Sequence, residues 1–563
     1  MNMPNNKNLI ETTGRPSDEE LLFLPLGGAG EIGMNLNLYG HAGKWLMIDL
    51  GITFGDDETP GVDVIMPDPS YIEERKEDLA GLIITHAHED HLGAVAHLWP
   101  RLQCPVYATA FAASILRRKL TEAGLVDKVP VTVVPLSGKF SVGPFDIELI
   151  TLTHSIPEPN ACVVRTPLGA VMHTGDWKLD PDPLVGPSAD GEALSKLGDD
   201  GVLAMVCDST NVFVPGHTKS EADVRRKLID VVGGLKQRVS IACFASNIAR
   251  LETAAFVGAA CGRQVSLAGR SLWRFYEVAK ENGYLTDVDR FLDPEEAAHL
   301  PRDKVLYVCT GSQGEPRAAL TRISQGDHRH VAFEKGDTVV FSSRVIPGNE
   351  KSISRLHNRL AALGVDIITA KDIPDVHVSG HPARDELAQM YQWIRPKIAV
   401  PVHGERRHLE EHVSLAKTCQ VPETQLALNG DLVRLAPGPV QVIEKVFAGR
   451  LIVDGNRVLP SENLALRDRR KMLFNGSAVA TLVMDKDGYL RDDPLVTVQG
   501  VYDLNNDDEI ANSVVDAIIE AVDSLPRRSN DDAVQTSARN ALRRRLRDLC
   551  GKRPETDVHI VRL

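Results

Sequence analysis

Residues 85–93, Thr-His-Ala-His-Glu-Asp-His-Leu-Gly, place three histidines and one aspartate within six positions. Imidazole nitrogens and carboxylate oxygens are the ligands that zinc and similar divalent ions take in proteins. The motif directly follows the apolar run of residues 79–84, whose length and glycine predict a buried strand. A single loop at the end of a strand therefore carries four candidate metal ligands: His86, His88, Asp90 and His91.

Further candidate ligands follow strands that lie much later in the chain. The strand-like stretch 145–153 ends at His154, and the strand predicted at 169–173 is followed by Thr-Gly-Asp176. His377 and His381 share the segment Asp-Val-His-Val-Ser-Gly-His, and a strand at 398–400 leads into Pro-Val-His403-Gly-Glu. One such residue would usually be a cap or a solvated side chain. Several in succession favour loops that converge on a shared metal site.

A glycine-rich stretch near the start matches the G-x-G-x-x-G pattern through Gly28, Gly30 and Gly33, and Asp49 lies where a ribose-binding acid would be expected. A dinucleotide site needs a helix after the glycines, whereas residues 34–39 alternate as a strand does. We therefore predict a turn between two strands. Because the next strand, at 44–50, ends beside this turn, Asp49 is a candidate hydrogen-bond partner for a metal-binding histidine.

After a strand at 202–207 and Asp208, strands and helices alternate regularly. The strands are predicted at 240–244, 264–268, 305–309 and 338–341, and the helices at 247–258, 272–281, 315–323 and 351–363. This alternation predicts a parallel sheet with helices on its faces. Because metal-type motifs flank it, the region is predicted to be an insertion in the metal-binding domain.

The four loops at the ends of these strands contain small and hydroxyl residues, including Ala245, Ser246 and Asn247 in one loop and Ser343 and Arg344 in another. Backbone N–H groups in such loops, directly before helices, suit phosphate groups. Plain N-capping explains any single loop equally well. The four loops together favour a cleft for an anionic ligand.

The composition bounds the class of protein. A chain of 563 residues is too long for one core, so two or three domains are expected. The polar N-terminus and the lack of a long apolar run predict a cytoplasmic protein without membrane association. The eight cysteines form no Cys-x-x-Cys pair and are predicted to be buried thiols in a reducing compartment. A net charge of −14 disfavours a non-specific polyanion binder, but it allows a local basic groove.

The motifs resemble those of a known superfamily. Residues 85–91 resemble the H-x-H-x-D-H signature of the metallo-β-lactamase superfamily, and His154 and Asp176 match its third and fourth motifs. Asp208, the segment 377–381 and the segment around His403 resemble motifs A, B and C of the β-CASP nucleases. The glycine-rich opening, Phe-Ala-Ser-Asn at 244–247, Thr-Gly-Ser-Gln-Gly-Glu-Pro at 310–316 and the small C-terminal domain are similar to the bacterial ribonuclease J family.

This resemblance implies an α/β fold with a metallo-β-lactamase αββα sandwich, an inserted β-CASP parallel α/β domain and a small α+β C-terminal domain. The expected parts are a polar tail at 1–20, the metallo-β-lactamase domain at 21–212 and 371–460, the β-CASP insertion at 213–370, a linker at 461–475 and the C-terminal domain at 476–563. In that last domain we expect a hairpin around 485–488, helices at 508–525 and 531–550 and a strand at 558–563.

The resemblance also assigns roles to residues. Two ions, zinc with manganese or magnesium as alternatives, would share Asp176 as a bridge. The first ion would be bound by His86, His88, His154 and Asp176, and the second by Asp90, His91, Asp176 and His403. The expected catalytic residues are His381 as general acid, Asp208 as its orienting partner, and Asp90. Binding of the scissile phosphate would involve His377, Val378, Ser379, Gly380 and His381. A structural calcium ion would map to Gly61, Asp63 and Asp454.

The activity implied is hydrolysis of RNA phosphodiesters from the 5′ end, with a preference for a 5′-monophosphate, together with endonuclease activity in RNA maturation and decay. The terminal phosphate would bind at Ser246 and Asn247 with Arg250, or at Ser343 and Arg344. The implied partners are single-stranded RNA, further copies of the chain in a homodimer or homotetramer, and proteins of an RNA-decay complex.

Three alternatives remain at this point: a DNA-processing β-CASP nuclease, a small-molecule hydrolase such as a thioesterase or lactamase, and a non-catalytic RNA-binding subunit. The insertion disfavours the small-molecule hydrolase, and the complete set of metal ligands disfavours the non-catalytic subunit. The predicted helix at 531–550 carries Arg543, Arg544, Arg545 and Arg547. Its basic face is either solvated or in contact with a partner, or it contacts the RNA backbone.

Overall fold

The structure is a computed structural model that describes residues 15–56, 58–502, 508–527 and 529–563. These residues form two compact units. Unit 1 contains residues 15–53 and 65–450, and unit 2 contains residues 54–64 together with the described part of 451–563. Of the predicted polar tail, residues 1–14 lie outside the described residues.

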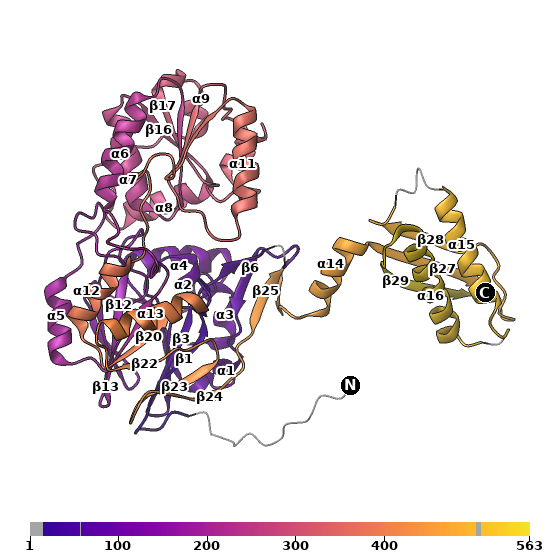
Figure 1. Cartoon of the computed structure of the whole chain (residues 1–563), viewed down its shortest axis with the longest axis horizontal. Helices are drawn as coiled ribbons and strands as arrows, with labels where there is room; N and C mark the ends of the chain where they lie inside the picture. The colour runs from indigo at the N-terminus through magenta and orange to yellow at the C-terminus, as the bar shows by residue number, and fades with distance from the viewer. Residues whose placement is uncertain (1–14, 57, 503–507, 528) are drawn as a thin grey trace. The chain divides into compact units, whose positions relative to one another are not determined.

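Two sheets in unit 1 pack face to face (Figure 1). The eight-stranded sheet has the order β24 (Gln441–Lys445), β23 (Asp431–Ala436), β1 (Leu21–Gly27), β3 (Leu36–His41), β4 (Lys44–Ile48), β7 (Leu79–Ile83), β8 (Val106–Ala108) and β9 (Val131–Val133). The seven-stranded sheet has the order β10 (Lys139–Val142), β11 (Phe145–Thr151), β12 (Asn160–Thr166), β13 (Gly169–His173), β14 (Ala204–Asp208), β20 (Ile398–Val402) and β22 (Glu423–Thr424).

The core between these sheets follows from the period-2 pattern of their strands. Phe145, Ile147 and Leu149 are alternate residues of β11, and all three point into one buried cluster with Phe23 and Tyr39 of the facing sheet. Helices cover the outer faces, so the predicted αββα sandwich is confirmed. They are α1 (Ser70–Glu73), α2 (Glu89–Leu92), α3 (Val95–Leu102) and α4 (Ala110–Glu122) on one side, and α5 (Gly191–Asp200), α12 (Arg384–Ile394) and α13 (Arg406–Thr418) on the other.

The inserted lobe begins after β14 and ends before β20, two strands that pair in parallel with Asp208 opposite Val402. Its five-stranded parallel sheet has the order β16 (Gln264–Ala268), β17 (Val305–Cys309), β15 (Val239–Ala242), β18 (Thr338–Phe341) and β19 (Asp366–Ile368). The surrounding helices are α6 (Glu221–Gly234), α7 (Ile248–Ala260), α8 (Arg270–Glu281), α9 (Pro294–Ala298), α10 (Ala319–Ser324) and α11 (Glu350–Ala362). The predicted insertion with alternating strands and helices is confirmed.

Unit 2 contains a three-stranded sheet, in which β27 (Ser477–Met484) pairs antiparallel with β28 (Leu495–Gln499) and parallel with β29 (Glu555–Arg562). Helices α15 (Asp508–Asp523) and α16 (Asp531–Cys550) pack on it through Val514, Ile518, Ala538 and Leu542. The unit also contains the hairpin of β25 (Arg450–Asp454) and β26 (Arg457–Pro460). The short strands β5 (Thr53–Phe54) and β6 (Val64–Pro67) flank residues 55–63.

Some predicted elements differ from the structure. Most of the predicted linker at 461–475 is helix α14 (Leu464–Asn475), whose N-cap Asn463 accepts a hydrogen bond from the backbone N–H of Leu466. The helix predicted from residue 315 begins only at Ala319, because the Glu315 carboxylate accepts a bond from the Gln313 N–H in a turn.

The prediction for the glycine-rich stretch is confirmed. The glycine-rich stretch is followed by strand β3 rather than a helix. The eight cysteines are free thiols, and five of them are buried. Within the described parts of the chain, every helix is too short or too polar to cross a membrane.

Candidate metal centre

The parallel strands of unit 1 bring distant residues to the same edge. β13, β14 and β20 are adjacent and parallel, so the chain just beyond their carboxyl ends places Asp176, Asp208 and His403 side by side. In the facing sheet, β4 and β7 are also parallel and end next to Asp49 and His86. Side chains from the ends of five strands therefore meet at one place, and Asp176, His86 and His403 among them are candidate ligands.

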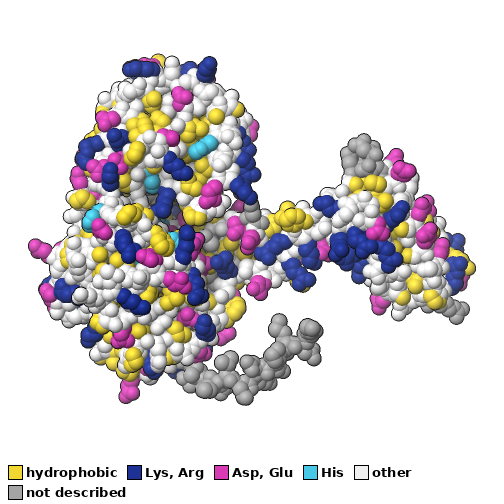
Figure 2. Space-filling model, in the orientation of Figure 1, with side chains coloured by type: hydrophobic (Ala, Val, Ile, Leu, Met, Phe, Trp, Pro, Cys, Tyr) yellow, Lys and Arg dark blue, Asp and Glu magenta, His cyan; other side chains and the backbone are white. Residues whose placement is uncertain are grey.

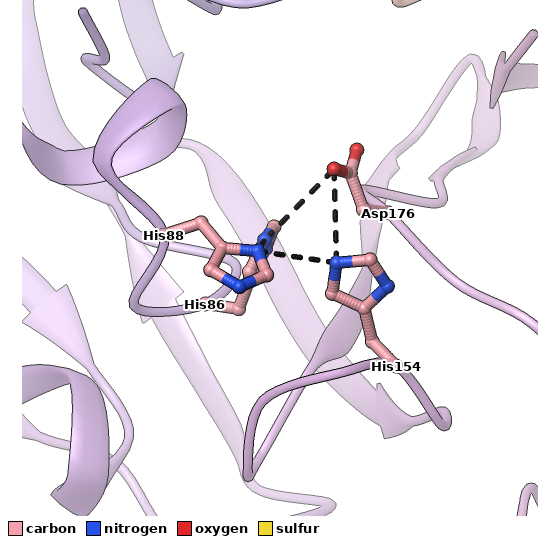
Figure 3. Close-up of side chains that lie close together, drawn as sticks. All are labelled: His86, His88, His154 and Asp176. Atoms are coloured by element: carbon pink, nitrogen blue, oxygen red, sulfur yellow. Dashed lines mark hydrogen bonds and ion pairs between the residues drawn. The ribbon is translucent and has the colours of Figure 1, made fainter. Parts of the chain in front are cut away.

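One group consists of His86, His88, His154 and Asp176 (Figure 3). His88 Nδ1 lies 3.1 Å from Nε2 of His86 and 3.1 Å from Nε2 of His154. Asp176 Oδ2 lies 4.0 Å from each of the same two Nε2 atoms. Ligands at zinc distances of about 2.0–2.2 Å in a tetrahedral shell are about 3.3 Å apart. The spacing of these four atoms therefore fits the shell of one ion.

A second group contains Asp90, His91, Asp176 and His403. Asp176 Oδ2 lies 3.2 Å from His91 Nε2 and 3.5 Å from His403 Nε2. Asp90 Oδ2 is 3.6 Å from His91 Nε2 and 3.8 Å from His403 Nε2. The second oxygen of Asp176, Oδ1, is buried and has no hydrogen-bond partner among the described residues. A buried carboxylate without such partners is costly, and a bound cation would offset that cost.

Hydrogen bonds to the other ring nitrogen hold four of these histidines in place. Nδ1 lies 2.7 Å from Asp49 Oδ2 in His91, 3.0 Å from Asn35 Oδ1 in His403 and 2.5 Å from the Gly380 carbonyl in His154. In His86 it lies 3.0 Å from the Thr85 hydroxyl, which itself donates to Asp49. With Nδ1–H as the donor to these acceptors, Nε2 is the ring nitrogen available to a metal ion. In His91 this Nε2 also lies 3.1 Å from Asn35 Nδ2.

The protonation states of the first group suit metal binding. Burial lowers the pKa of His86 and of His154 well below the ordinary value, and it lowers the pKa of His88 to about 4. Burial acts to raise the pKa of Asp176, but the neighbouring histidines outweigh it and hold the pKa well below the ordinary value. At neutral pH these groups are therefore neutral imidazoles and a carboxylate, the forms that bind divalent ions. In the second group, burial acts to lower the pKa of His91, but the carboxylates of Asp176, Asp90 and Asp49 outweigh it and raise the pKa well above the ordinary value.

The backbone at two of these positions is strained. Asp49 has φ 63° and His403 has φ 51°, the left-handed region that non-glycine residues rarely adopt. The His403 N–H donates to the Gly28 carbonyl at 2.6 Å, and β2 (Ala29–Gly30) pairs in parallel with β21 (Gly404–Glu405). The glycine-rich turn therefore supports the loop that carries His403, which is a structural role for the G-x-G pattern.

His381 lies beside both groups. Its Nδ1 is 2.8 Å from Asp208 Oδ2 and 3.8 Å from Asp176 Oδ2. Burial acts to lower the pKa of His381, but the carboxylates of Asp208 and Asp176 outweigh it and raise the pKa to about 9. The imidazole is therefore protonated at neutral pH, as a proton donor must be.

Sequence reasoning missed Asn211, which connects the surrounding loops. Its Nδ2 donates to Ser379 Oγ at 2.8 Å and to the His381 carbonyl at 3.0 Å, and its Oδ1 accepts a bond from the Arg344 guanidinium. Asn35 and Thr85 were missed as well. The only sequence signal for all three was their position beside a recognised motif.

The remaining predicted substrate residues differ in how accessible they are. Arg344 is exposed, and Ala245, Ser246, Ser343 and His377 are half-buried. Val378 is buried, and the Asn247 side chain caps α7. Arg250 was predicted to bind a terminal phosphate, and this is wrong. Its side chain is fully buried, forms an ion pair with Glu221 at 2.9 Å and donates to the Ser342 carbonyl at 3.0 Å.

The predicted calcium residues Gly61, Asp63 and Asp454 all belong to unit 2. Asp454 Oδ2 forms an ion pair with Arg469 at 2.9 Å, so one proposed ligand already has a cationic partner. No group of three or more acidic, histidine or cysteine ligands includes these residues within the described chain. The calcium site stays a prediction.

Replacing Gly380 by alanine is expected to weaken metal binding about 10- to 100-fold, the usual effect of disturbing a partner that orients a ligand. A Cβ atom at Gly380 would lie 2.6 Å from His154 Cε1 and 2.8 Å from its Nδ1, so the His154 ring would have to move. Metal analysis after dialysis measures the effect. Gly234→Ala is the control, because a Cβ there meets nothing within 4 Å. Equal metal content in both variants would contradict the prediction.

Comparison with known proteins tests the resemblance. Family models match in succession along the chain: "Metallo-beta-lactamase superfamily" at residues 33–231, "Ribonuclease J, beta-CASP domain" at 236–360, "Zn-dependent metallo-hydrolase RNA specificity domain" at 348–422 and "Ribonuclease J C-terminal domain" at 464–563. A ribonuclease J from Sinorhizobium meliloti is 44% identical over 97% of this chain and 98% of its own length. The chain belongs to the ribonuclease J family.

Other ribonuclease J relatives are more distant. Ribonuclease J 1 of Streptococcus pyogenes is 37% identical over 83% of both chains, and ribonuclease J of Thermus thermophilus is 36% identical over 84% of both. A crystal structure of a protein of unknown function from Enterococcus faecalis has a TM-score of 0.52, is 15% identical and covers 74% of this chain and 100% of its own, which is a likeness of fold alone.

Membership in the ribonuclease J family confirms the predicted fold and makes the chain a metal-dependent ribonuclease that binds RNA. The exact domain boundaries stay predictions.

Proposed function

We propose that this ribonuclease J binds two zinc ions and hydrolyses single-stranded RNA from the 5′ end, with a preference for a 5′-monophosphate and with additional endonuclease activity. The observation that supports two ions most directly is the position of Asp176 Oδ2. This atom lies at 4.0 Å from His86 Nε2 on one side, and at 3.2 Å from His91 Nε2 and 3.5 Å from His403 Nε2 on the other. One carboxylate oxygen is therefore shared by two groups of ligands.

The proposed chemistry is in-line hydrolysis of a phosphodiester. When bound at such a site, two divalent ions make hydroxide available near neutral pH and offset the charge of the phosphate oxygens. The leaving 3′-oxygen requires a proton, and His381 is the proposed donor. Asp208 accepts from His381 Nδ1 at 2.8 Å, which directs Nε2 toward the substrate and keeps the ring protonated. Asp90 acts as a ligand beside the reacting atoms.

Substrate binding is proposed at the loops around His381. Ser379 and Arg344 are joined through Asn211, so a hydroxyl and a guanidinium lie next to the proton donor. An arginine guanidinium can contact a phosphate through two parallel hydrogen bonds, and Arg344 is exposed. With Arg250 buried, Ser343 and Arg344 are the better supported site for a terminal phosphate, while Ala245 and Ser246 line the same lobe.

The biological setting is also proposed: maturation of rRNA and decay of mRNA in the cytoplasm, as a homodimer or homotetramer, with partners from an RNA-decay complex. Eight free thiols are consistent with a reducing compartment. The DNA-processing alternative is tested by comparing the cleavage rates of single-stranded DNA and of RNA with the same sequence. Faster cleavage of the DNA would contradict the proposal and favour the DNA-processing nuclease.

The 5′-end preference is tested with three RNAs of one sequence. They carry a 5′-monophosphate, a 5′-triphosphate or a 5′-hydroxyl. The monophosphate substrate is expected to be degraded at least about 10-fold faster, because a charge-assisted contact to the phosphate contributes about 1.5–3 kcal/mol. Labelling at the 5′ end should release a mononucleotide first, and labelling at the 3′ end should show endonucleolytic fragments.

Equal rates on all three RNAs would exclude a terminal-phosphate pocket. The same assay, after removal of metal by a chelator and addition of zinc, manganese or magnesium in turn, identifies the ion that supports activity.

A further inference from the structure

A large aromatic side chain is exposed near the catalytic loops and has no assigned role. Phe213 is 52% exposed, and the neighbouring Val214 is 38% exposed. The Phe213 ring makes an edge-on contact with His408, with the ring centroids 5.4 Å apart, and the Arg407 guanidinium lies 5.9 Å from its centroid. The ring is therefore supported by a second ring and a cation, although it remains open to solvent.

The position of Phe213 is tied to the active site from two sides. It follows Asn211 by two residues, and the Val214 N–H donates to the Asn211 carbonyl at 2.8 Å in a tight turn. Asn211 holds Ser379, His381 and Arg344, as described above.

On the other side, His408 packs over Gly404, the residue after the metal-site residue His403. A Cβ atom at Gly404 would lie 2.9 Å from His408 Cβ.

Arginine side chains lie on the elements next to Phe213. Arg406 and Arg407 begin helix α13 and form ion pairs with Glu410 at 2.8 Å and Glu405 at 3.0 Å, respectively. Arg384 begins α12, forms an ion pair with Glu411 at 2.5 Å, and its N–H donates to the Val214 carbonyl at 2.8 Å. Arg344 lies on a neighbouring loop. Figure 2 shows Lys, Arg and His side chains, with Asp and Glu side chains among them, where the two lobes of unit 1 meet. Proteins that bind single-stranded nucleic acid combine such a charged surface with aromatic rings on which bases stack.

We propose that Phe213, supported by Arg407 and His408, is a stacking site for one nucleobase of the RNA, close to the scissile phosphate. The inference deepens the proposed function and rests on RNA as the substrate. A phenyl ring accepts the π face of any base, so the site would contribute affinity and position without sequence preference. Arg407 adds a cation near the same ring and attracts the adjacent phosphate.

The test measures RNA binding and cleavage by the full chain carrying Phe213→Ala, Phe213→Trp or the control Phe256→Ala. Phe256 is a matched control because it is 40% exposed and the Arg225 guanidinium lies 4.3 Å from its ring centroid. It differs from Phe213 in its position, since it lies on helix α7 and not beside the catalytic loops. Phe213→Ala is expected to raise KM about 10-fold with a smaller change in kcat, in line with the loss of one stacked base. Phe213→Trp and Phe256→Ala should keep the wild-type KM.

A series of RNAs with a single abasic site at successive positions then locates the base. At one position the abasic RNA should bind wild-type protein about 10-fold more weakly and the Phe213→Ala variant no more weakly than intact RNA. Binding is measured with His381→Ala in the background, so it does not depend on cleavage. If no position shows this coupling, or if Phe256→Ala has the same effect, the stacking site is excluded. Equal cleavage rates on RNAs with different 5′ ends, with the coupling intact, would instead exclude only the proposed preference for a 5′-monophosphate.

Discussion

Asp176→Asn is expected to remove both metal ions and to lower RNA hydrolysis by at least about 10³-fold, because metal ions supply several kcal/mol of transition-state stabilisation. Asp176 Oδ2 is the only atom that belongs to both groups of four candidate ligands among the described residues. The amide keeps the size of the side chain but removes its charge and places an N–H₂ group where an anionic ligand is needed.

Metal analysis of the purified variant, together with cleavage of 5′-monophosphorylated RNA, measures this effect. Asp146→Asn is the matched control, since Asp146 is an exposed carboxylate on β11 that accepts a bond from Ser141. In metal-free protein, Asp176→Asn should not lower the unfolding temperature, because a buried and incompletely paired charge is removed. A variant that retains two ions per chain would contradict the bridging role of Asp176.

His381→Ala is expected to lower kcat about 10²- to 10⁴-fold, the usual contribution of a positioned proton donor, while both ions remain bound. His381 also belongs to a third group of candidate ligands, with Asp208 and His403, so metal content decides between the two roles. Loss of zinc in the variant would place His381 among the metal ligands. Retained zinc together with a low kcat would support the proton donor.

The pH profile provides a second readout for His381. Its pKa is raised to about 9, so the proton that it donates is present below that pH and is lost as the pH rises through it. Wild-type kcat should therefore fall above about pH 9, and this limb should be absent from the His381→Ala profile. If kcat of the variant still falls above about pH 9, the fall belongs to another titrating group.

The metal ligands could be predicted because their signal is local. Residues 86–91 hold four of them within six positions, and His154, Asp176 and His403 each follow a recognisable strand. The inserted lobe was predictable for a similar reason, since alternating strands and helices have a period that the sequence displays. Helix α14 was missed although Asn463 before it and Gly476 after it are capping signals.

Other features could not be read from neighbouring residues. The burial of Arg250 depends on Glu221, 29 positions earlier, and on Ser342, 92 positions later. Asn211 and Asn35 are ordinary polar residues in sequence, and only the folded chain brings Asn211 to Ser379 and Asn35 to His403.

The sequence by itself therefore determined the chemical type of the centre and the class of fold, because ligand identity and hydrophobic period are properties of short segments. The tertiary structure decided how the ligands divide into two groups around Asp176 Oδ2, which partner orients each imidazole, and that Phe213 lies open beside the catalytic loops. These features depend on the parallel pairing of β13, β14 and β20, which places Asp208 and His403 side by side although 195 positions separate them.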